Sequence, residues 1–246
     1  MDAIETDTGL QATPEYIPPS GAALSRFHNL HRGERCVIVC NGPSLNQMDL
    51  GFLRHEIVFG LNKIHLGLTR FGFYPRYLVA VNDLVIKQSL DAFREMTCIK
   101  FLSDRAGAAL PQDAWTYHVH TTGVTERFHR DITQGVREGH TVTHAALQIA
   151  YYMGFTDVVI IGMDHRFEAE GAPNQVLHME GPDPNHFSPD YFGGHSWEAP
   201  NLKESEISYQ AAQDIYEAEN RRIIDATLGG DCPIFPKSDY RNVFQV

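Results

Sequence analysis

Cys36-Val-Ile-Val-Cys-Asn-Gly-Pro-Ser-Leu45 joins a predicted strand to a predicted helical segment. The run 37–39 is apolar throughout, which is typical of a strand buried on both faces of a parallel sheet. Gly42 can adopt the positive φ of a sharp turn, Pro43 suits a first helical position, and Ser44 adds a hydroxyl there. A helix N-terminus after a parallel strand is a site for anions, usually phosphate. The bend therefore predicts a nucleotide phosphate site, with an ordinary turn that holds no ligand as the alternative.

From residue 35 onward, strand-like apolar runs alternate with helix-like segments. The predicted strands cover residues 36–40, 56–61, 76–81, 97–102, 116–120, 157–161 and 222–226. The predicted helices cover residues 47–54, 63–68, 84–94, 143–153 and 203–221. Strands that alternate with helices form parallel sheets, so the expected fold class is α/β: a Rossmann-like, mainly parallel sheet with helices on both faces. Its site is expected at the carboxyl ends of the strands.

Two segments fall outside this alternation. Residues 1–24 contain Thr, Pro, Gly and Ser without periodicity, and we expect a mobile N-terminal arm. Residues 165–201 are rich in Pro, Gly, His and aromatic residues. A loop of this length inside a compact domain usually has a function. We therefore predict one domain over residues 25–246, with residues 165–201 as a lid or acceptor-side insertion.

The composition of the 246-residue chain excludes several classes of protein. Lys and Arg number 20 against 31 Asp and Glu, a net charge of −11, whereas a nucleic-acid partner demands a basic surface. No apolar run approaches the roughly 20 residues that cross a bilayer, and the acidic N-terminus lacks the features of a secretory signal. The four cysteines form no Cys-x-x-Cys pair, as expected of buried, reduced thiols. We therefore expect a cytoplasmic protein, and leave open peripheral contact with the inner face of the membrane and a homo-oligomeric state.

The sharpest candidate for chemistry is His186, which lies between Asp183 and Asp190 in a proline-bounded part of the lid. Imidazole is the natural general base for a hydroxyl near neutral pH, and a neighbouring carboxylate can fix its tautomer. The alternative is a loop histidine bonded to backbone. A metal site is a further alternative, built from His178, His195 and these three residues, but the spacings match no defined zinc pattern.

Asparagines follow three predicted strands at corresponding places: Asn41, Asn62 and Asn82. Their amides carry both donors and acceptors, which suits a base edge, a ribose or a sugar. A single asparagine in this place is usually a turn residue, but three indicate a binding cleft. Another strand ends in the 162–164 turn, Gly162-Met163-Asp164, where a doubly wound fold keeps its chemistry. We include Gly162 and Asp164 among the expected nucleotide-binding residues.

The order of these motifs resembles that of bacterial sialyltransferases of the metal-independent, CMP-sugar-using type. More broadly, the chain is similar to the superfamily of motility accessory factors and 6-hydroxymethylpterin diphosphokinase-like proteins. The resemblance covers the chain from Arg35 to Phe244. It is carried by Asn41-Gly-Pro-Ser-Leu45, Asn62, Asn82, the segment from Thr141 to Gly154, Gly162-Met-Asp164 and Asn185-His186-Phe187.

The sialyltransferase resemblance implies a role for each matching residue. The bend residues Asn41, Gly42, Pro43 and Ser44 would hold the nucleotide, bordered by Thr141 and Thr143. Asn62 and Asn82 would contact the CMP-sugar, and His186 would activate the acceptor hydroxyl. Tyrosine hydroxyls stabilise the departing phosphate in that family, and Tyr191 is the candidate here. No metal or other cofactor is then required.

The sequence therefore predicts a glycosyltransferase that moves a sugar, of the acidic nonulosonate type, from a CMP-type donor to a glycan or related acceptor. One alternative is an ATP-dependent diphosphokinase acting on a hydroxymethylpterin-like substrate. That branch implies Mg²⁺, with Asp83 and Asp164 as its ligands. The other alternative is a nucleotide-binding protein without catalytic activity.

Overall fold

The computed structural model describes residues 20–123, 127–168 and 171–246 of the chain. Its main sheet has seven parallel strands in the order β5-β4-β3-β2-β1-β6-β9. The chain leaves β1 in one direction through β2 to β5 and then returns to the other side of β1 with β6. The order therefore reverses between β1 and β6, which is where open α/β sheets place their ligands.

All seven predicted strands of the main sheet are confirmed, together with the α/β fold class. The strands are β1 Arg35–Val39, β2 Val58–Leu61, β3 Tyr77–Ala80, β4 Ile99–Ser103, β5 Thr116–Val119, β6 Asp157–Ile161 and β9 Arg222–Asp225. The helices are α1 Ser20–Leu24, α2 Leu68–Phe71, α3 Asp83–Gln88, α4 Leu90–Glu95, α5 Val142–Tyr152, α6 Leu202–Ala218 and α7 Tyr240–Phe244. None of the described helices has the length and apolar character needed to cross a membrane.

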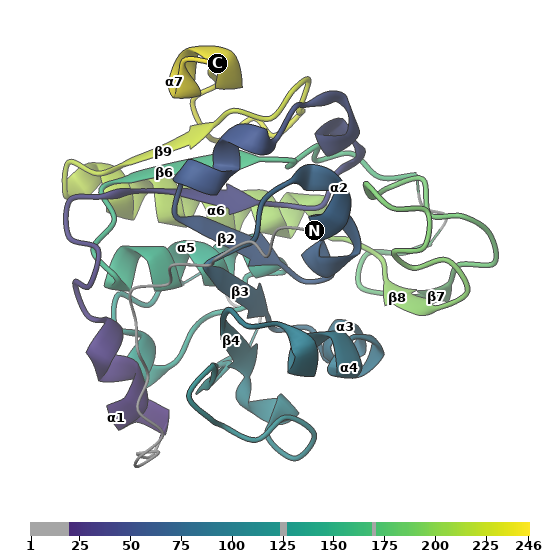
Figure 1. Cartoon of the computed structure of the whole chain (residues 1–246), viewed down its shortest axis with the longest axis horizontal. Coiled ribbons are helices and arrows are strands. Elements are labelled where there is room, and N and C mark those ends of the chain that lie inside the picture. Colours follow the sequence, from purple (N-terminus) through teal and green to yellow (C-terminus); the bar gives the residue numbers. More distant parts are fainter. Residues whose placement is uncertain (1–19, 124–126, 169–170) are drawn as a thin grey trace, which may run out of the picture.

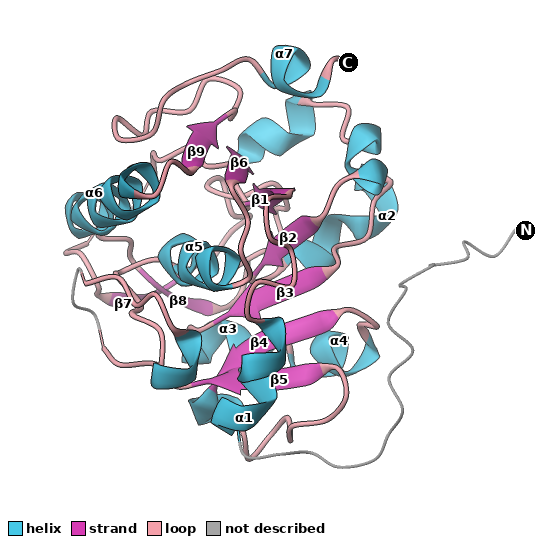
Figure 2. Ribbon diagram, turned by 90° about the vertical axis from the view of Figure 1, so that its left-hand side faces the viewer, coloured by secondary structure: helices cyan, strands magenta, loops and turns pink. Residues whose placement is uncertain are grey.

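Alternate residues of each strand enter two separate apolar cores, one on each face of the sheet. On one face, Ile38 of β1 packs with residues of α1, α5 and α6. On the other face, Val37 and Val39 pack with residues of α3 and α4 and with aromatic side chains of the lid. Figure 2 shows α5 and α6 on one side of the row of strands and α2 on the other. Burial on both faces explains the apolar runs by which the strands were predicted.

Three predicted helices are wrong in kind or extent. The segment predicted over 63–68 is a 3-10 turn, Ile64–Gly67, and the α-helix α2 begins only at Leu68. The segment predicted as a helix over 47–54 contains two 3-10 turns, Pro43–Gln47 and Gly51–His55. The segment predicted over 84–94 is divided at Ser89 into α3 and α4. Ser89 has φ −121° and ψ 11°, which ends the helical backbone. Short turns of this kind have no long apolar period from which their limits can be predicted.

The lid, residues 165–201, contains two short strands that the sequence pattern did not predict. Val176–His178 (β7) pairs antiparallel with Ser196–Glu198 (β8), and Figure 1 shows this hairpin projecting from one side of the molecule. Three-residue strands separated by a long loop leave almost no alternation to detect.

The predicted N-terminal arm is only partly within the described residues. Residues 1–19 lie outside them, but the arm was predicted to continue to residue 24. In the structure Ser20–Leu24 forms α1, and Ala23 and Leu24 are buried in the core. The prediction is therefore wrong for residues 20–24, because an apolar pair packs this short helix against the sheet.

We expect Leu24→Ala to lower the free energy of unfolding by about 3 kcal/mol, because it deletes buried methyl groups and leaves a cavity. The matched control is Leu30→Ala, since Leu30 is 43 % exposed. That control is expected to change stability by less than about 0.5 kcal/mol. Urea denaturation measures the free energy of unfolding of both variants. If both changes were equally small, the predicted mobile arm would extend to residue 24 after all.

Candidate active site

A cavity of about 260 Å³ opens at the carboxyl edge of the sheet, at the point where the strand order reverses. Its wall is formed by residues that follow β1, β2, β3 and β6, by the start of α5 and by the lid. Ten of the twelve predicted site residues line it: Asn41, Gly42, Asn62, Asn82, Thr141, Thr143, Gly162, Asp164, His186 and Tyr191. The fold thus brings together residues from all parts of the chain, whatever their individual roles.

The bend after β1 differs from its predicted form. Gly42 has φ −68°, so the predicted positive φ is wrong. Glycine is needed there for space instead: a Cβ at Gly42 would lie 1.8 Å from Oδ2 of Asp164. A positive φ occurs instead at Gly162, which follows the neighbouring strand β6 and has φ 71°. The Gly42 N–H donates to the Gly162 carbonyl (2.8 Å), which brings the ends of β1 and β6 into direct contact.

The helix start after this bend is already occupied by a carboxylate of the chain itself. Asp164 accepts hydrogen bonds from the Ser44 N–H (3.2 Å) and the Ser44 hydroxyl (2.7 Å). Pro43 has no N–H, and neither Pro43 nor Ser44 lies in the cavity wall. The bend therefore has an internal anion where the sequence predicted a nucleotide phosphate, and Asn41 and Gly42 are the bend residues that remain available to a ligand.

Asp164 itself is 4 % exposed. Burial raises its pKa above the usual value, while the Ser44 hydrogen bonds and the charge of Arg166 oppose that rise. Arg166 Nη2 lies 3.6 Å from Asp164 Oδ1, at the start of the lid. Arg166 is the only Lys or Arg among the described residues of the wall, which also contains Glu138, Asp164 and Glu198.

The three strand-end asparagines have different surroundings. Asn82 caps α3, because its Oδ1 accepts from the N–H groups of Leu84 (2.9 Å) and Val85 (3.2 Å). Its Nδ2 donates to Glu198 of the lid. Asn82 is therefore a helix cap as well as a wall residue, as expected of a turn asparagine.

The other two asparagines have unused acceptors. Asn41 Nδ2 donates to the Leu61 carbonyl (3.1 Å), which fixes the orientation of the amide. Within the described part of the chain, the Oδ1 atoms of Asn41 and Asn62 are buried without a hydrogen-bond partner. A buried acceptor without a partner costs free energy, so both sites favour a ligand that supplies donors.

The lid places a histidine–carboxylate pair in the wall. His186 Nδ1 lies 2.8 Å from Asp183 Oδ2, and the Asp183 side chain is fully buried. The His186 ring stacks on Tyr191 with centroids 3.9 Å apart and an interplanar angle of 1°. Because Nδ1 bonds the carboxylate, Nε2 is the ring nitrogen left for a substrate. The predicted pairing with Asp183 is present, and the other predicted neighbour, Asp190, makes no salt bridge among the described residues.

Tyr191 is buried beneath His186. Its hydroxyl accepts from the Lys63 N–H (3.4 Å), and burial raises its pKa. The side chain of Lys63 lies here too: Nζ donates to the Tyr191 carbonyl (2.5 Å) and to Gln88 Oε1 (2.7 Å). Sequence reasoning passed over Lys63, although it directly follows Asn62 at a strand end and its position was a usable signal.

The start of α5 forms another part of the wall. Thr141 caps the helix by accepting from the Thr143 N–H (3.3 Å), and its hydroxyl contacts that of Tyr209 (3.1 Å). A second histidine–carboxylate pair lies beside it, His165 Nε2 to Glu206 Oε1 (2.9 Å). His165 directly follows Asp164 in the sequence. No sequence pattern links it to Glu206, 41 residues later.

Comparisons with known proteins place the chain in a family. A family model described as 6-hydroxymethylpterin diphosphokinase MptE-like matches residues 15–170, more than half of the chain. The chain belongs to the MptE-like family. A search of curated proteins finds no match. The predicted resemblance to this superfamily is therefore confirmed.

Among solved structures, the chain is similar to the MAf glycosyltransferase from Magnetospirillum magneticum AMB-1, with a TM-score of 0.55 and 12 % sequence identity. The similarity covers 90 % of this chain but only 38 % of the other one. At this identity the likeness shows the fold alone. The MptE-like chain thus has the same α/β architecture as part of a longer glycosyltransferase.

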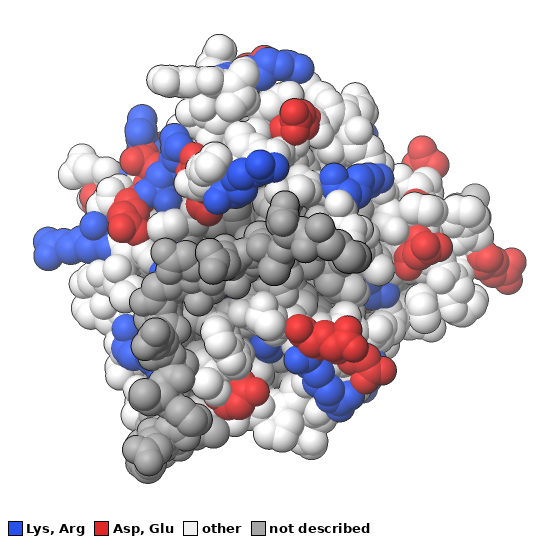
Figure 3. Space-filling model, viewed as in Figure 1, with Lys and Arg blue, Asp and Glu red and all other residues white. Residues whose placement is uncertain are grey.

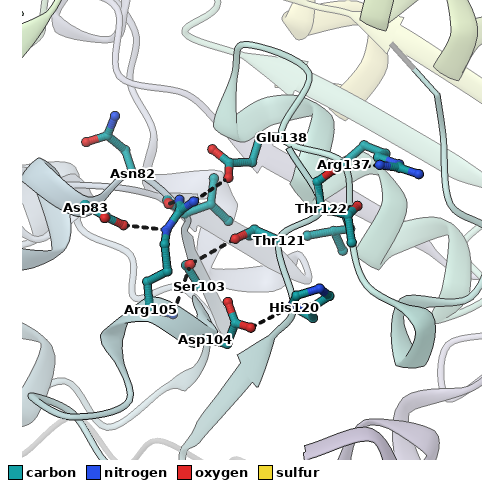
Figure 4. Close-up of polar contacts among 12 residues, drawn as sticks. Asn82, Asp83, Ser103, Asp104, Arg105, His120, Thr121, Thr122, Arg137 and Glu138 are labelled. Carbon is teal, nitrogen blue, oxygen red and sulfur yellow. Dashed lines mark hydrogen bonds and ion pairs between the residues drawn. The ribbon is translucent and has the colours of Figure 1, made fainter. Parts of the chain in front are cut away.

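Asp83 and Asp164, the Mg²⁺ ligands that the diphosphokinase alternative implies, do not lie in one site. Figure 4 shows Asp83 bonded to Arg105, which also binds Glu138. Asp83 lies outside the cavity wall, and Asp164 is bonded to Ser44. Across residues 20–123, 127–168 and 171–246, no three His, Cys, Asp or Glu side chains form a group able to hold a metal ion. The donors present in this MptE-like chain do not fit the Mg²⁺ site predicted from Asp83 and Asp164.

We expect Gly42→Ala to lower the free energy of unfolding by about 3 kcal/mol, because the new Cβ must displace the Asp164 carboxylate from Ser44. Gly181→Ala is the matched control, since no atom of the described residues lies within 4 Å of a Cβ built there. Thermal and urea unfolding measure both variants. If Gly42→Ala were as stable as Gly181→Ala, the tight joint between β1 and β6 would be contradicted.

Proposed function

We propose that the chain is a glycosyltransferase that moves an acidic nonulosonate-type sugar from a CMP-type donor to a hydroxyl of a glycan or related acceptor. The observation that carries the proposal is the His186–Asp183 pair in the wall of the cavity at the strand-order reversal. A buried carboxylate on Nδ1 leaves Nε2 unprotonated in the neutral ring, as a general base requires.

The chemistry follows from this arrangement. Nε2 takes the proton of the acceptor hydroxyl while its oxygen forms a bond to the anomeric carbon of the donor sugar. The bond from that carbon to the phosphate oxygen breaks, and the electron pair leaves with CMP. The imidazolium that forms is stabilised by Asp183, whose oxygen lies 2.8 Å from Nδ1.

We place the departing phosphate at the start of α5 and not at the bend after β1, because Asp164 already occupies the Ser44 donors of that bend. The N-terminus of α5 carries a partial positive charge, and Arg166 and His165 stand in the same wall. Tyr191 was the sequence candidate for this task. Its hydroxyl lies against the Lys63 backbone, so we now propose that Tyr191 supports the His186 ring instead.

The charge of the wall favours a donor with a single phosphate. Arg166 stands with the carboxylates of Asp164 and Glu198, while the third carboxylate, Glu138, is paired with Arg105. In the face shown in Figure 3, acidic side chains also gather over the lid, at the right of the view. A triphosphate would add about four negative charges to this surface and needs a metal to offset them. A CMP-sugar carries one phosphate charge, which the α5 terminus and Arg166 can balance.

A second candidate is an ATP-dependent diphosphokinase, and the observation that favours it is the MptE-like family match over residues 15–170. That match ends before Asp183 and His186, so it does not include the lid chemistry. A nucleotide-binding protein without turnover is the third possibility, and it would keep the cavity without using His186.

We expect His186→Gln to lower the rate of sugar transfer by about 100- to 10,000-fold while nucleotide affinity changes less than about twofold, because a general base acts mainly in the transition state. His195→Gln is the matched control: His195 lies in the same lid but is exposed and outside the wall. Transfer assays and calorimetric nucleotide titration measure the two effects. A comparable loss of transfer in His195→Gln, or none in His186→Gln, would contradict the assignment.

A panel of nucleotides separates the candidate functions. We expect CMP to raise the melting temperature by about 5–10 °C at a hundredfold excess over its Kd, with no need for Mg²⁺. The panel is CMP, CDP, CTP, UDP, ADP and ATP, each with and without Mg²⁺, read by thermal unfolding. Stabilisation by ATP only in the presence of Mg²⁺, followed by AMP release, would favour the diphosphokinase. Stabilisation by CMP with neither hydrolysis nor transfer of any donor would favour the binding protein.

A further inference from the structure

Lys63 is a buried lysine behind the candidate base. It follows Asn62 at the end of β2 and is only 4 % exposed. Its ammonium donates to the Tyr191 carbonyl (2.5 Å) and to Gln88 Oε1 (2.7 Å). Among the described residues it makes no salt bridge, so its charge is held by neutral oxygens. Gln88 in turn donates to the Ser196 carbonyl of the lid (2.7 Å).

Lys63 holds Tyr191 at two points. Its backbone N–H donates to the Tyr191 hydroxyl (3.4 Å), and its side chain bonds the Tyr191 carbonyl. The Tyr191 ring stacks on the parallel ring of His186, with centroids 3.9 Å apart. Lys63 Nζ also lies 4.8 Å from the ring centroid of Phe192, which contacts the edge of His186. The plane of His186 therefore depends on an aromatic platform that Lys63 secures.

Burying the charged ammonium of Lys63 costs free energy, and an uncharged side chain could fill the same space. Burial lowers the pKa of Lys63 to about 8, and the Asp183 carboxylate opposes that fall. A methionine of similar length could fill this space without an ammonium to desolvate, and such replacements of buried charges are often neutral or stabilising. The bonds that this ammonium makes, above all the one to the Tyr191 carbonyl, therefore point to a role in placing Tyr191.

We propose that Lys63 is a positioning residue for His186: it fixes the ring plane through Tyr191, and so holds Nδ1 in its hydrogen bond with Asp183. The base role of His186 rests on the proposed function. The positioning role does not, because it concerns the geometry and the tautomer of the ring.

The test is the tautomer of His186 in protein labelled with ¹⁵N-histidine. In the parent chain we expect a single Nδ1–H tautomer, with the ring protons of His186 shifted upfield by the stacked Tyr191. His186→Gln assigns these signals among the 13 histidines. In Lys63→Met we expect the nitrogen shifts of His186 to converge through tautomer exchange and the upfield shift to shrink. Neither measurement needs a sugar donor or an acceptor substrate.

Lys100→Met is the matched control. Lys100 is as buried as Lys63, at 3 % exposure, and its ammonium also bonds carbonyls, those of Met96 and Cys98. Both carbonyls precede β4, at the amino-terminal edge of the sheet, whereas the cavity lies at the carboxyl edge. We expect Lys100→Met to leave the His186 signals unchanged, so that a general loss of stability is separated from a loss of positioning.

Unchanged His186 signals in folded Lys63→Met would overturn the proposal, as would an equal change in Lys100→Met. If Lys63→Met does not fold, Lys63→Leu removes the same donor to Tyr191 with a shorter side chain, and the same two outcomes decide. Once transfer is established, kcat should fall about tenfold in Lys63→Met at constant KM, because an effect confined to the transition state changes kcat. Altered His186 signals without any transferase activity would uphold the positioning role and reject the glycosyltransferase.

Discussion

The joint between the ends of β1 and β6 is the contact on which the site depends. The Gly42 N–H meets the Gly162 carbonyl, and the Asp164 carboxylate accepts both the N–H and the hydroxyl of Ser44. Those two bonds use the helix start that would otherwise be free to bind an anion, so a phosphate must be held elsewhere. They also fix the two strand ends between which the chain reverses direction, and this gives the cavity a rigid floor.

The lid is attached to that floor through backbone atoms. The Phe187 N–H donates to the Asn41 carbonyl (2.9 Å), and Asn46 Nδ2 donates to the Phe187 carbonyl (3.0 Å). The aromatic residues of the lid belong to the same core as Val37 and Val39 of β1. His186 is therefore held by the sheet, one residue from a main-chain bond to the bend, and does not depend on a freely swinging flap. This limits the ordering that binding must supply.

Most of the sheet could be predicted from the sequence because burial on both faces leaves continuous apolar runs such as 37–39 and 158–161. The His186–Asp183 pair could also be predicted, since its members are only three positions apart in the sequence. The Ser44–Asp164 bond spans 120 residues and the support of His186 by Lys63 spans the sheet and the lid, so neither leaves a local pattern. α1 was missed for a different reason: five residues are too few to show a helical period.

Locally unfavourable backbone conformations and unpaired polar groups are concentrated around the cavity. Seven described residues other than glycine have positive φ, and four of them line the cavity: Asn62, His140, His165 and Asn174. The same wall holds the unpartnered acceptors of Asn41 and Asn62, and the buried ammonium of Lys63 lies behind it. Each feature lowers stability, and folding alone gives no reason for them to share one edge of the sheet. Their concentration there argues for a binding and catalytic site independently of the family match, since strain and unpaired polar groups persist where a ligand makes use of them.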